Sequence, residues 1–190
     1  KLTGLKKVKT AVFISGTGSN LKNLIKFSKI KNSPISIILI ISNTTQAKGL
    51  KYANQFNIKK KIFNFQNFTD AEKNISTLLK KEKIKFICLA GFMKILSKDF
   101  IKKFEGKIVN IHPSLLPKYK GLNTHNRAIK NQDKFAGCTV HYVTAQLDSG
   151  KTILQKKIRI TLKDNETTLA KKVLKQEHKL YPAAIIKIFN

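Results

Sequence analysis

The 190-residue sequence has no tryptophan, one methionine, two cysteines and only ten acidic residues. Cys88 and Cys138 each lie in an apolar, strand-like run, which is typical of small buried residues and not of a disulfide or a metal site. No aliphatic run is longer than residues 37–41, whereas a membrane-spanning helix needs roughly 18 apolar residues. No signal-peptide pattern opens the chain. We therefore expect no membrane association and no metal, and a cytoplasmic location.

Arginine is also scarce, although the chain is strongly basic. The formal net charge is +28, but among 38 basic residues only Arg127 and Arg159 are arginines. Surfaces that read bases or clamp phosphates favour arginine, because its guanidinium makes two parallel hydrogen bonds. The lysines are scattered, with no run longer than residues 59–61. We interpret them as a compositional bias and expect no specific nucleic-acid partner. The positive field should still attract small anionic substrates.

Apolar runs alternate with segments of helical periodicity through the first half of the chain. Buried strands are predicted at residues 11–14, 35–41 and 86–90, and a short strand is predicted at residues 61–63. Helices are predicted after the first three of these strands, and a short helix should follow Ser97. The predicted caps are Ser19 or Asn20 for the first helix, and a Thr69–Glu72 capping box for the third.

The second half should add a half-buried strand over residues 137–143 and an edge strand over 153–160. Between residues 110 and 137, a short helix over 125–131 should be capped by Thr124 or Asn123. The last helix should begin near Glu166 or Thr167, with an inward stripe of Ala170, Val173, Leu180, Tyr181 and Ala184. The whole pattern predicts one domain over residues 1–190. Its fold is α/β, with a Rossmann-like, doubly wound, mostly parallel sheet.

A candidate catalytic cluster follows the strand-like residues 107–109. Strand side chains alternate, so Asn110 and His112 should lie on one face at the end of this strand, before Pro113 stops the pairing. Asp148 lies in a turn-like segment after another strand, where its carboxylate could meet the histidine. From spacing alone, the alternative is equally acceptable: a turn asparagine, a loop histidine and a turn aspartate.

Three further features are consistent with a bound ligand, but each also has a purely structural explanation. Residues 15–20 form a Gly-rich turn between a strand and a helix, an arrangement that can hold a phosphate or can be an ordinary turn. Glu177 falls on the apolar stripe of the last helix, where a carboxylate is costly unless paired; it could also be a partly exposed acid at the rim. Residues 91–96 follow a central strand, where open α/β sheets bind ligands, although such apolar residues usually only pack.

The motifs Asn-Ile-His-Pro-Ser-Leu-Leu-Pro at 110–117, Val-His-Tyr-Val-Thr at 140–144 and Leu-Asp-Ser-Gly at 147–150 resemble those of the folate-dependent formyltransferases. Within them, the chain is most similar to the glycinamide ribonucleotide formyltransferases of purine synthesis. The likeness runs from about Lys9 to Tyr181. It implies transfer of a formyl group from 10-formyltetrahydrofolate, a co-substrate, to the amine of glycinamide ribonucleotide. No metal is implied, and the protein should be a monomer or homodimer.

The resemblance also assigns roles to particular residues of this sequence. The family's catalytic trio corresponds to Asn110, His112 and Asp148. The ribonucleotide would be bound by Gly16, Thr17, Gly18, Ser19, Asn20 and Glu177, and the folate by Met93, Lys94, Ile95, Leu96, Asn110, Val143 and Asp148. The trio's carboxylate should raise the pKa of the histidine and orient its ring. His141 should pack or hydrogen-bond structurally.

The sequence departs from the family at three places. Lys94 and Asn123 stand where relatives often have arginine and histidine, and residues 65–70 contain no arginine.

Three alternative functions use some of the same features. Methionyl-tRNA formyltransferases and formyltetrahydrofolate hydrolases share the Asn–His–Asp trio. The first usually has a tRNA-binding domain after the catalytic one and the second an additional N-terminal domain, and we expect neither here. A basic nucleic-acid-binding α/β module is disfavoured by the scattered lysines.

Overall fold

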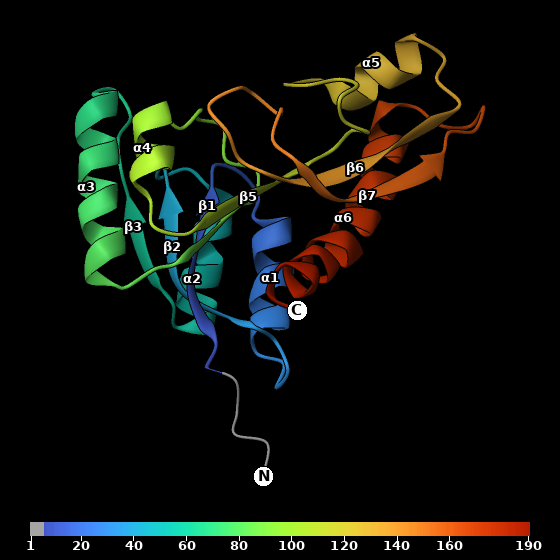
Figure 1. The fold of residues 1–190 in the computed structure, drawn as a ribbon. Coiled ribbons are helices and arrows are strands. Elements are labelled where there is room, and N and C mark those ends of the chain that lie inside the picture. Colours follow the sequence, from blue (N-terminus) through green and yellow to red (C-terminus); the bar gives the residue numbers. More distant parts are fainter. Residues whose placement is uncertain (1–5) are drawn as a thin grey trace. The chain divides into compact units, whose positions relative to one another are not determined.

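The computed structural model describes residues 6–190, which form a seven-stranded sheet flanked by six α-helices (Figure 1). The strands are β1 (Val8–Ile14), β2 (Ile35–Ser42), β3 (Lys59–Ile62), β4 (Phe86–Leu89), β5 (Lys107–His112), β6 (Phe135–Tyr142) and β7 (Thr152–Arg159). The α-helices are α1 (Ser19–Ser28), α2 (Lys51–Phe56), α3 (Phe68–Lys81), α4 (Lys98–Lys103), α5 (Thr124–Lys130) and α6 (Glu166–Phe189), and a 3₁₀ turn, Lys48–Leu50, precedes α2.

The strand order is β3-β2-β1-β4-β5-β6-β7. β1 pairs in parallel with β2 and β4, and β2 pairs in parallel with β3, whereas β6 and β7 are antiparallel. The prediction of a doubly wound, mostly parallel sheet with β7 as an edge is confirmed. The chain divides into two compact units, Lys1–Val109 and Asn110–Asn190. The single domain predicted over residues 1–190 stays a prediction.

The core of the first unit is built from strands that are apolar on both faces. Ala11, Val12, Phe13 and Ile14 of β1 are completely buried, as are Leu39, Ile40 and Ile41 of β2. Parallel strands covered by helices on both sides require this continuous apolar pattern. α1 packs against β2 and α2, and α3 packs against α4. The edge strand β3 is exposed and lysine-rich, which discourages pairing with another chain.

In the second unit, α6 packs along β6 and β7 (Figure 1). β6 is buried at six consecutive positions, so the predicted half-buried strand is wrong: both of its faces are covered. α6 begins at Glu166, as predicted, and continues through Pro182. Leu169 is buried on its inward stripe, and Ala170 is only half-buried, so the predicted stripe began one residue late.

Several predicted helix caps are wrong because other groups take those positions. Gly18, with φ of 76°, is the N-cap of α1, and the predicted caps Ser19 and Asn20 are its first residues. Asn67 caps α3 by accepting a hydrogen bond from the Asp70 N–H. The predicted capping-box residue Glu72 instead turns inward, and its carboxylate accepts from the Ser97 N–H and hydroxyl. Ser97 caps α4 as predicted. α5 begins at Thr124 after Asn123, whose side chain makes no capping hydrogen bond.

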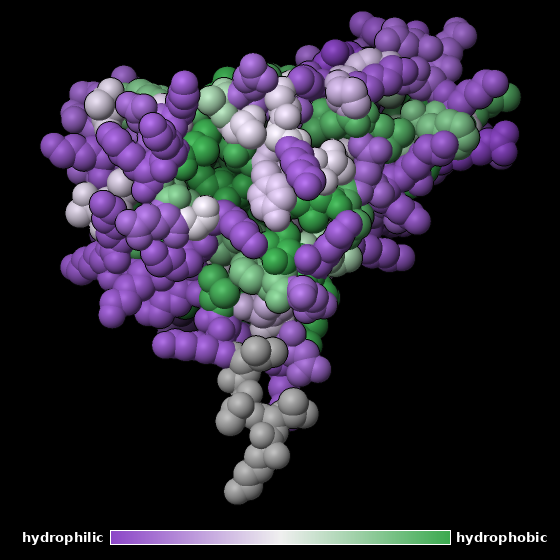
Figure 2. Space-filling model, in the orientation of Figure 1, coloured by the Kyte–Doolittle hydropathy of each residue, from purple (hydrophilic) through white to green (hydrophobic). Residues whose placement is uncertain are grey.

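Hydrophilic side chains dominate the outer parts of the face shown in Figure 2, in keeping with the lysine content. Cys88 and Cys138 are both buried, as predicted. Within residues 6–190, no helix is long and apolar enough to cross a membrane.

Candidate active site

Asn110 and His112 lie at the carboxyl end of β5, as the strand alternation predicted. Asn110 is half-buried and His112 is 6% exposed. The strand ends at His112, because Pro113 has no N–H with which to continue the ladder. β5 therefore presents an amide and an imidazole from a rigid element.

Asp148 meets two histidines in the second unit. Its Oδ2 lies 3.3 Å from His112 Nδ1, and its Oδ1 lies 3.6 Å from His141 Nε2. The Gly121 N–H donates to Oδ2 at 2.9 Å. The Asp148 side chain is only 7% exposed, and its backbone φ of 46° lies in the left-handed region, which is costly for a residue other than glycine. The structure thus brings the predicted Asp148 and His112 together, with His141 on the other carboxylate oxygen.

His141 also contacts Asn110. Its Nδ1 lies 2.9 Å from the Tyr142 carbonyl oxygen, which can only accept, so Nδ1 carries a proton. In the neutral ring Nε2 is then an acceptor, and the Asn110 amide nitrogen lies 3.3 Å from it. This contact orients the Asn110 amide. The expected structural role of His141 is incomplete, because the side chain belongs to the same cluster as the predicted trio.

Both ring nitrogens of His112 have partners. Nε2 lies 2.8 Å from the Tyr119 carbonyl oxygen, so Nε2 carries a proton, and Nδ1 faces Asp148. Burial lowers the pKa of His112, and this effect outweighs the Tyr119 carbonyl and the Asp148 carboxylate, which raise it. Asp148 raises the pKa as expected, but the net direction is downward. The carboxylate acts in the expected sense, but desolvation of the imidazolium is larger.

Asp148 is held as a carboxylate. Burial raises its pKa, but the nearby His141, the hydrogen bond from the Gly121 N–H and the nearby His112 bring the pKa below its ordinary value. A buried anion beside a neutral histidine can accept or stabilise one proton at the His112 Nδ1 position.

The Gly-rich turn of the first unit has two close backbone approaches. The Gly49 N–H donates to the Gly16 carbonyl at 3.0 Å, and a Cβ on Gly18 would lie 2.5 Å from the Gly49 Cα. Gly16 and Thr17 are exposed, and the N-terminus of α1 with its positive dipole end follows directly. Ser19 and Asn20 form the first turn of α1.

Ser15 joins this turn to the segment predicted to line a folate pocket. Its hydroxyl donates to Asn43 Oδ1 at 2.5 Å, and its oxygen accepts from the Met93 N–H at 2.8 Å. Met93 and Ile95 are 63% and 59% exposed, whereas Leu96 is buried. Met93, Lys94 and Ile95 can therefore meet a ligand directly. The buried Leu96 supports the segment by packing in the interior.

Glu177 is 7% exposed, so it is a buried carboxylate and not an acid at the rim. It lies on the stripe of α6, the helix that packs against β6, and its charge adds to the burial that raises the pKa of Cys138 to about 12. Val143, just after β6, is half-buried.

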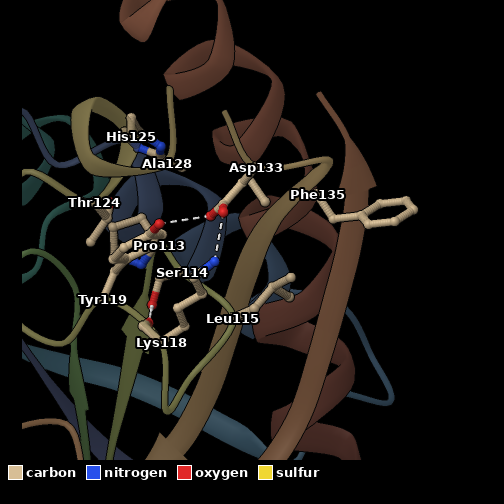
Figure 3. A pocket seen from close by; sticks show the side chains of 11 residues that line it. Pro113, Ser114, Leu115, Lys118, Tyr119, Thr124, His125, Ala128, Asp133 and Phe135 are labelled. Carbon is tan, nitrogen blue, oxygen red and sulfur yellow. Dashed lines mark hydrogen bonds and ion pairs between the residues drawn. The ribbon is translucent and has the colours of Figure 1, made fainter. Parts of the chain in front are cut away.

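A small hollow lies beside the segment that follows His112 (Figure 3). It is lined by Pro113, Ser114, Leu115, Lys118, Tyr119, Thr124, His125, Ala128, Asp133, Phe135 and Ala136. Its volume of about 20 Å³ can hold a water molecule but not a folate. Over residues 6–190, no group of three or more His, Cys, Asp or Glu side chains is placed to hold a metal ion.

The site includes groups that the sequence did not indicate. Tyr119 and Gly121 act through main-chain atoms, which no residue pattern reveals, and Ser15 gave no signal beyond its place in a Gly-rich turn. His141 did have a signal, since it lies in a motif shared with the formyltransferases.

Comparisons with known proteins give a family match over most of the chain. The formyl transferase family model matches residues 8–185. The chain is 42% identical over 180 residues to the phosphoribosylglycinamide formyltransferase of Haemophilus influenzae, covering 93% of this chain and 85% of that protein. It is 42% identical over 183 residues to the human trifunctional purine biosynthetic protein adenosine-3, with 95% of this chain covered.

The chain spans only 18% of the length of that human relative and of its chicken counterpart. Among solved structures, the phosphoribosylglycinamide formyltransferase of Brucella melitensis superimposes with a TM-score of 0.91 at 41% identity, covering 97% of this chain and 96% of that one. The sequence match, the shared fold and the Asn–His–Asp cluster lead to one conclusion: the chain belongs to the formyl transferase family.

Proposed function

We propose that this chain is a one-carbon transferase of purine synthesis. It passes the formyl group of 10-formyltetrahydrofolate to the amine of glycinamide ribonucleotide, giving formylglycinamide ribonucleotide and tetrahydrofolate. The observation that carries the proposal is the cluster of Asn110, His112 and Asp148, in which an ionised carboxylate lies against a buried imidazole. The family match supports the reaction class, and the relatives' names support the acceptor.

The first step forms a carbon–nitrogen bond. The amine attacks the formyl carbon, and the carbonyl oxygen becomes an oxyanion that needs donors aimed at it. The Asn110 amide, oriented by His141, supplies one. His112 supplies a positive charge beside the oxyanion once it is protonated. A direct hydrogen bond from His112 requires one of its present contacts, to the Tyr119 carbonyl or to Asp148, to be shared or broken.

The second step breaks the bond between the formyl carbon and the folate nitrogen. The attacking nitrogen loses a proton, which His112 Nδ1 accepts directly or through water, with Asp148 stabilising the imidazolium. The His112 imidazolium then gives this proton, directly or through water, to the folate nitrogen, which leaves as the oxyanion collapses. No oxidation occurs and the proton count balances.

The substrates are assigned by the family resemblance, segment by segment. Met93, Lys94, Ile95, Leu96 and Val143, with Asn110 and Asp148, would contact the folate. The exposure of Met93 and Ile95 supports this role. The turn of Gly16, Thr17, Gly18, Ser19 and Asn20 would receive the phosphate of the ribonucleotide, since an exposed turn at a helix N-terminus attracts anions. Glu177 would bind the ribonucleotide through its carboxylate.

The decisive assay measures folate turnover by the purified protein. We expect 10-formyltetrahydrofolate to be converted to tetrahydrofolate only when glycinamide ribonucleotide is present, because the amine is the nucleophile. Turnover with water alone would indicate a hydrolase, and turnover that requires charged initiator tRNA would indicate the tRNA enzyme. No turnover, with tight nucleic-acid binding, would indicate a basic module. Weak binding that is lost at physiological salt is expected from a charge of +28 in any case.

The phosphate turn can be tested through Gly18. A Gly18→Ala substitution places a Cβ 2.5 Å from the Gly49 Cα at a φ of 76°, so the backbone of the turn must shift. We expect KM for the ribonucleotide to rise by about tenfold or more, or about 1.4 kcal/mol, with folate affinity unchanged. Glu177→Ala should likewise weaken only ribonucleotide binding. Calorimetry that gives wild-type ribonucleotide affinity for both variants would contradict this placement.

A further inference from the structure

A four-residue segment, Lys118–Tyr119–Lys120–Gly121, contacts both His112 and Asp148 through main-chain atoms. The Tyr119 carbonyl lies 2.8 Å from His112 Nε2, and the Gly121 N–H donates to Asp148 Oδ2 at 2.9 Å. Tyr119 and Gly121 have φ values of 56° and 75°. A left-handed backbone at a non-glycine residue is maintained only when its surroundings enforce it. One segment therefore holds both members of the pair.

Side chains hold this segment in place at two of its carbonyls, those of Lys118 and Lys120. The Lys118 carbonyl accepts from the Ser114 hydroxyl at 2.6 Å, and the Lys120 carbonyl accepts from Arg127 Nη1 at 2.7 Å. The carbonyl between them, that of Tyr119, is the one that faces His112. Its position is thus fixed on both sides along the chain.

The Tyr119 side chain is anchored separately (Figure 3). Its hydroxyl donates to Asp133 Oδ2 at 2.8 Å and accepts from the Asn131 amide at 2.7 Å. The Arg127 guanidinium lies over the ring, 4.8 Å from its centroid. Asp133 is itself paired with Lys118 through its other oxygen at 2.6 Å. None of these side chains takes part in the reaction proposed above.

We propose that Tyr119 is a positioning residue: its carbonyl keeps a proton on His112 Nε2, and the Tyr119–Asp133 hydrogen bond holds that carbonyl in place. This inference rests on the proposed function only for its effect on catalysis. A carbonyl can only accept, so Nε2 must donate, and any proton that His112 gains or loses is exchanged at Nδ1, beside Asp148. Without the anchor, neutral His112 could place its proton on Nδ1 instead, where Asp148 would accept it, and those molecules would have no base at Nδ1.

The variants that test the anchor are Tyr119→Phe and Asp133→Asn. Tyr119→Phe removes the hydroxyl that donates this hydrogen bond, and Asp133→Asn weakens its acceptor. Both variants keep the main-chain carbonyl of residue 119. We expect kcat to fall about tenfold with little change in KM, as for other residues that orient a functional histidine. The matched control is Glu105→Gln, which breaks an exposed carboxylate–lysine pair, Glu105–Lys85, in the first unit. It should keep wild-type kcat.

A spectroscopic measurement separates positioning from general loss of structure. Long-range ¹⁵N–¹H spectra of ¹⁵N-histidine-labelled protein show which ring nitrogen of His112 carries the proton, with His112→Gln used for assignment. We expect one state, protonated at Nε2, in the wild type and a mixture in Tyr119→Phe. The charged or titratable groups that interact with His112 are Asp148, His141, Arg127 and His125. They are unchanged in the variant, so the His112 titration should move to lower pH as the carbonyl contact weakens.

The results that would overturn the positioning role of Tyr119 differ from those that would overturn the proposed function. A wild-type His112 protonated at Nδ1 when neutral, or variants with unchanged kcat and unchanged spectra in an active enzyme, would overturn the inference alone. A wild-type protein without formyl transfer would overturn the proposed function, while the spectra would still decide the role of Tyr119. If Tyr119→Phe does not fold, Asp133→Asn and the wild-type spectra decide the same question.

Discussion

Replacing His112 with alanine is expected to lower kcat for formyl transfer by at least about 10². His112 lies between the Tyr119 carbonyl and Asp148, so its loss removes both the proton acceptor and the positive charge that would face the oxyanion. Asn110→Ala and Asp148→Ala should have effects of similar size. Steady-state kinetics with both substrates at saturation would measure each loss.

The three losses should not add, because the side chains act as one unit. A His112→Ala/Asp148→Ala double variant should be scarcely slower than either single variant. His125→Ala is the matched control, since His125 is half-buried but makes no contact with Asp148. Near-normal turnover of His112→Ala would refute the catalytic assignment.

The pH dependence of turnover should reflect the protonation of His112. Burial holds the pKa of His112 below its ordinary value, so the ring is neutral and can accept a proton at neutral pH. As the pH falls through this lowered pKa, His112 is already protonated before the substrates react and cannot accept a proton. The attacking amine is protonated too. Turnover should therefore decline at acid pH. Asp148→Asn removes a charge that raises the pKa, so any remaining acid limb should move to lower pH. A profile that is flat from acid to neutral pH would contradict this chemistry.

Adding one methyl group at Gly150 is expected to disrupt the site without touching a catalytic side chain. A Cβ on Gly150 would lie 1.7 Å from the Tyr142 carbonyl oxygen, so the backbone of one of the two residues must move. That carbonyl accepts from His141 Nδ1, and Gly150 follows Asp148 by two residues. Gly150→Ala should therefore displace His141 and Asp148 together.

We expect Gly150→Ala to lower kcat by about 10²-fold, the effect of an approximately 1 Å misplacement. The free energy of unfolding should fall by about 1–3 kcal/mol, as for other overpacked sites. The control is Ser149→Ala, the exposed neighbour, where atoms are removed and none is added. Urea titrations and kinetics on both variants would measure the two effects. Wild-type kcat in Gly150→Ala would show that the carbonyl contact does not position the cluster.

Much of the fold could be predicted because it depends on local patterns. The apolar runs of β1, β2 and β4 could only be buried strands, and Ser97 was correctly identified as a cap because capping depends on neighbours a few residues away. Glu72 was wrongly placed in a capping box, because its carboxylate is bound by Ser97, 25 residues further along the chain. Local spacing carries no information about such a distant partner.

The candidate site also has some features that the sequence determines and others that only the tertiary structure determines. The sequence alone determined that Asn110 and His112 lie at the end of one strand, since side-chain alternation is a local property. It also identified Asp148, through a shared motif. Only the tertiary structure decided that His141 faces the same carboxylate, that the Tyr119 carbonyl sets the proton on His112, and that burial outweighs Asp148 in setting the pKa. Hydrogen-bond partners and desolvation depend on atoms that lie far apart along the chain, and they exist only once the chain has folded.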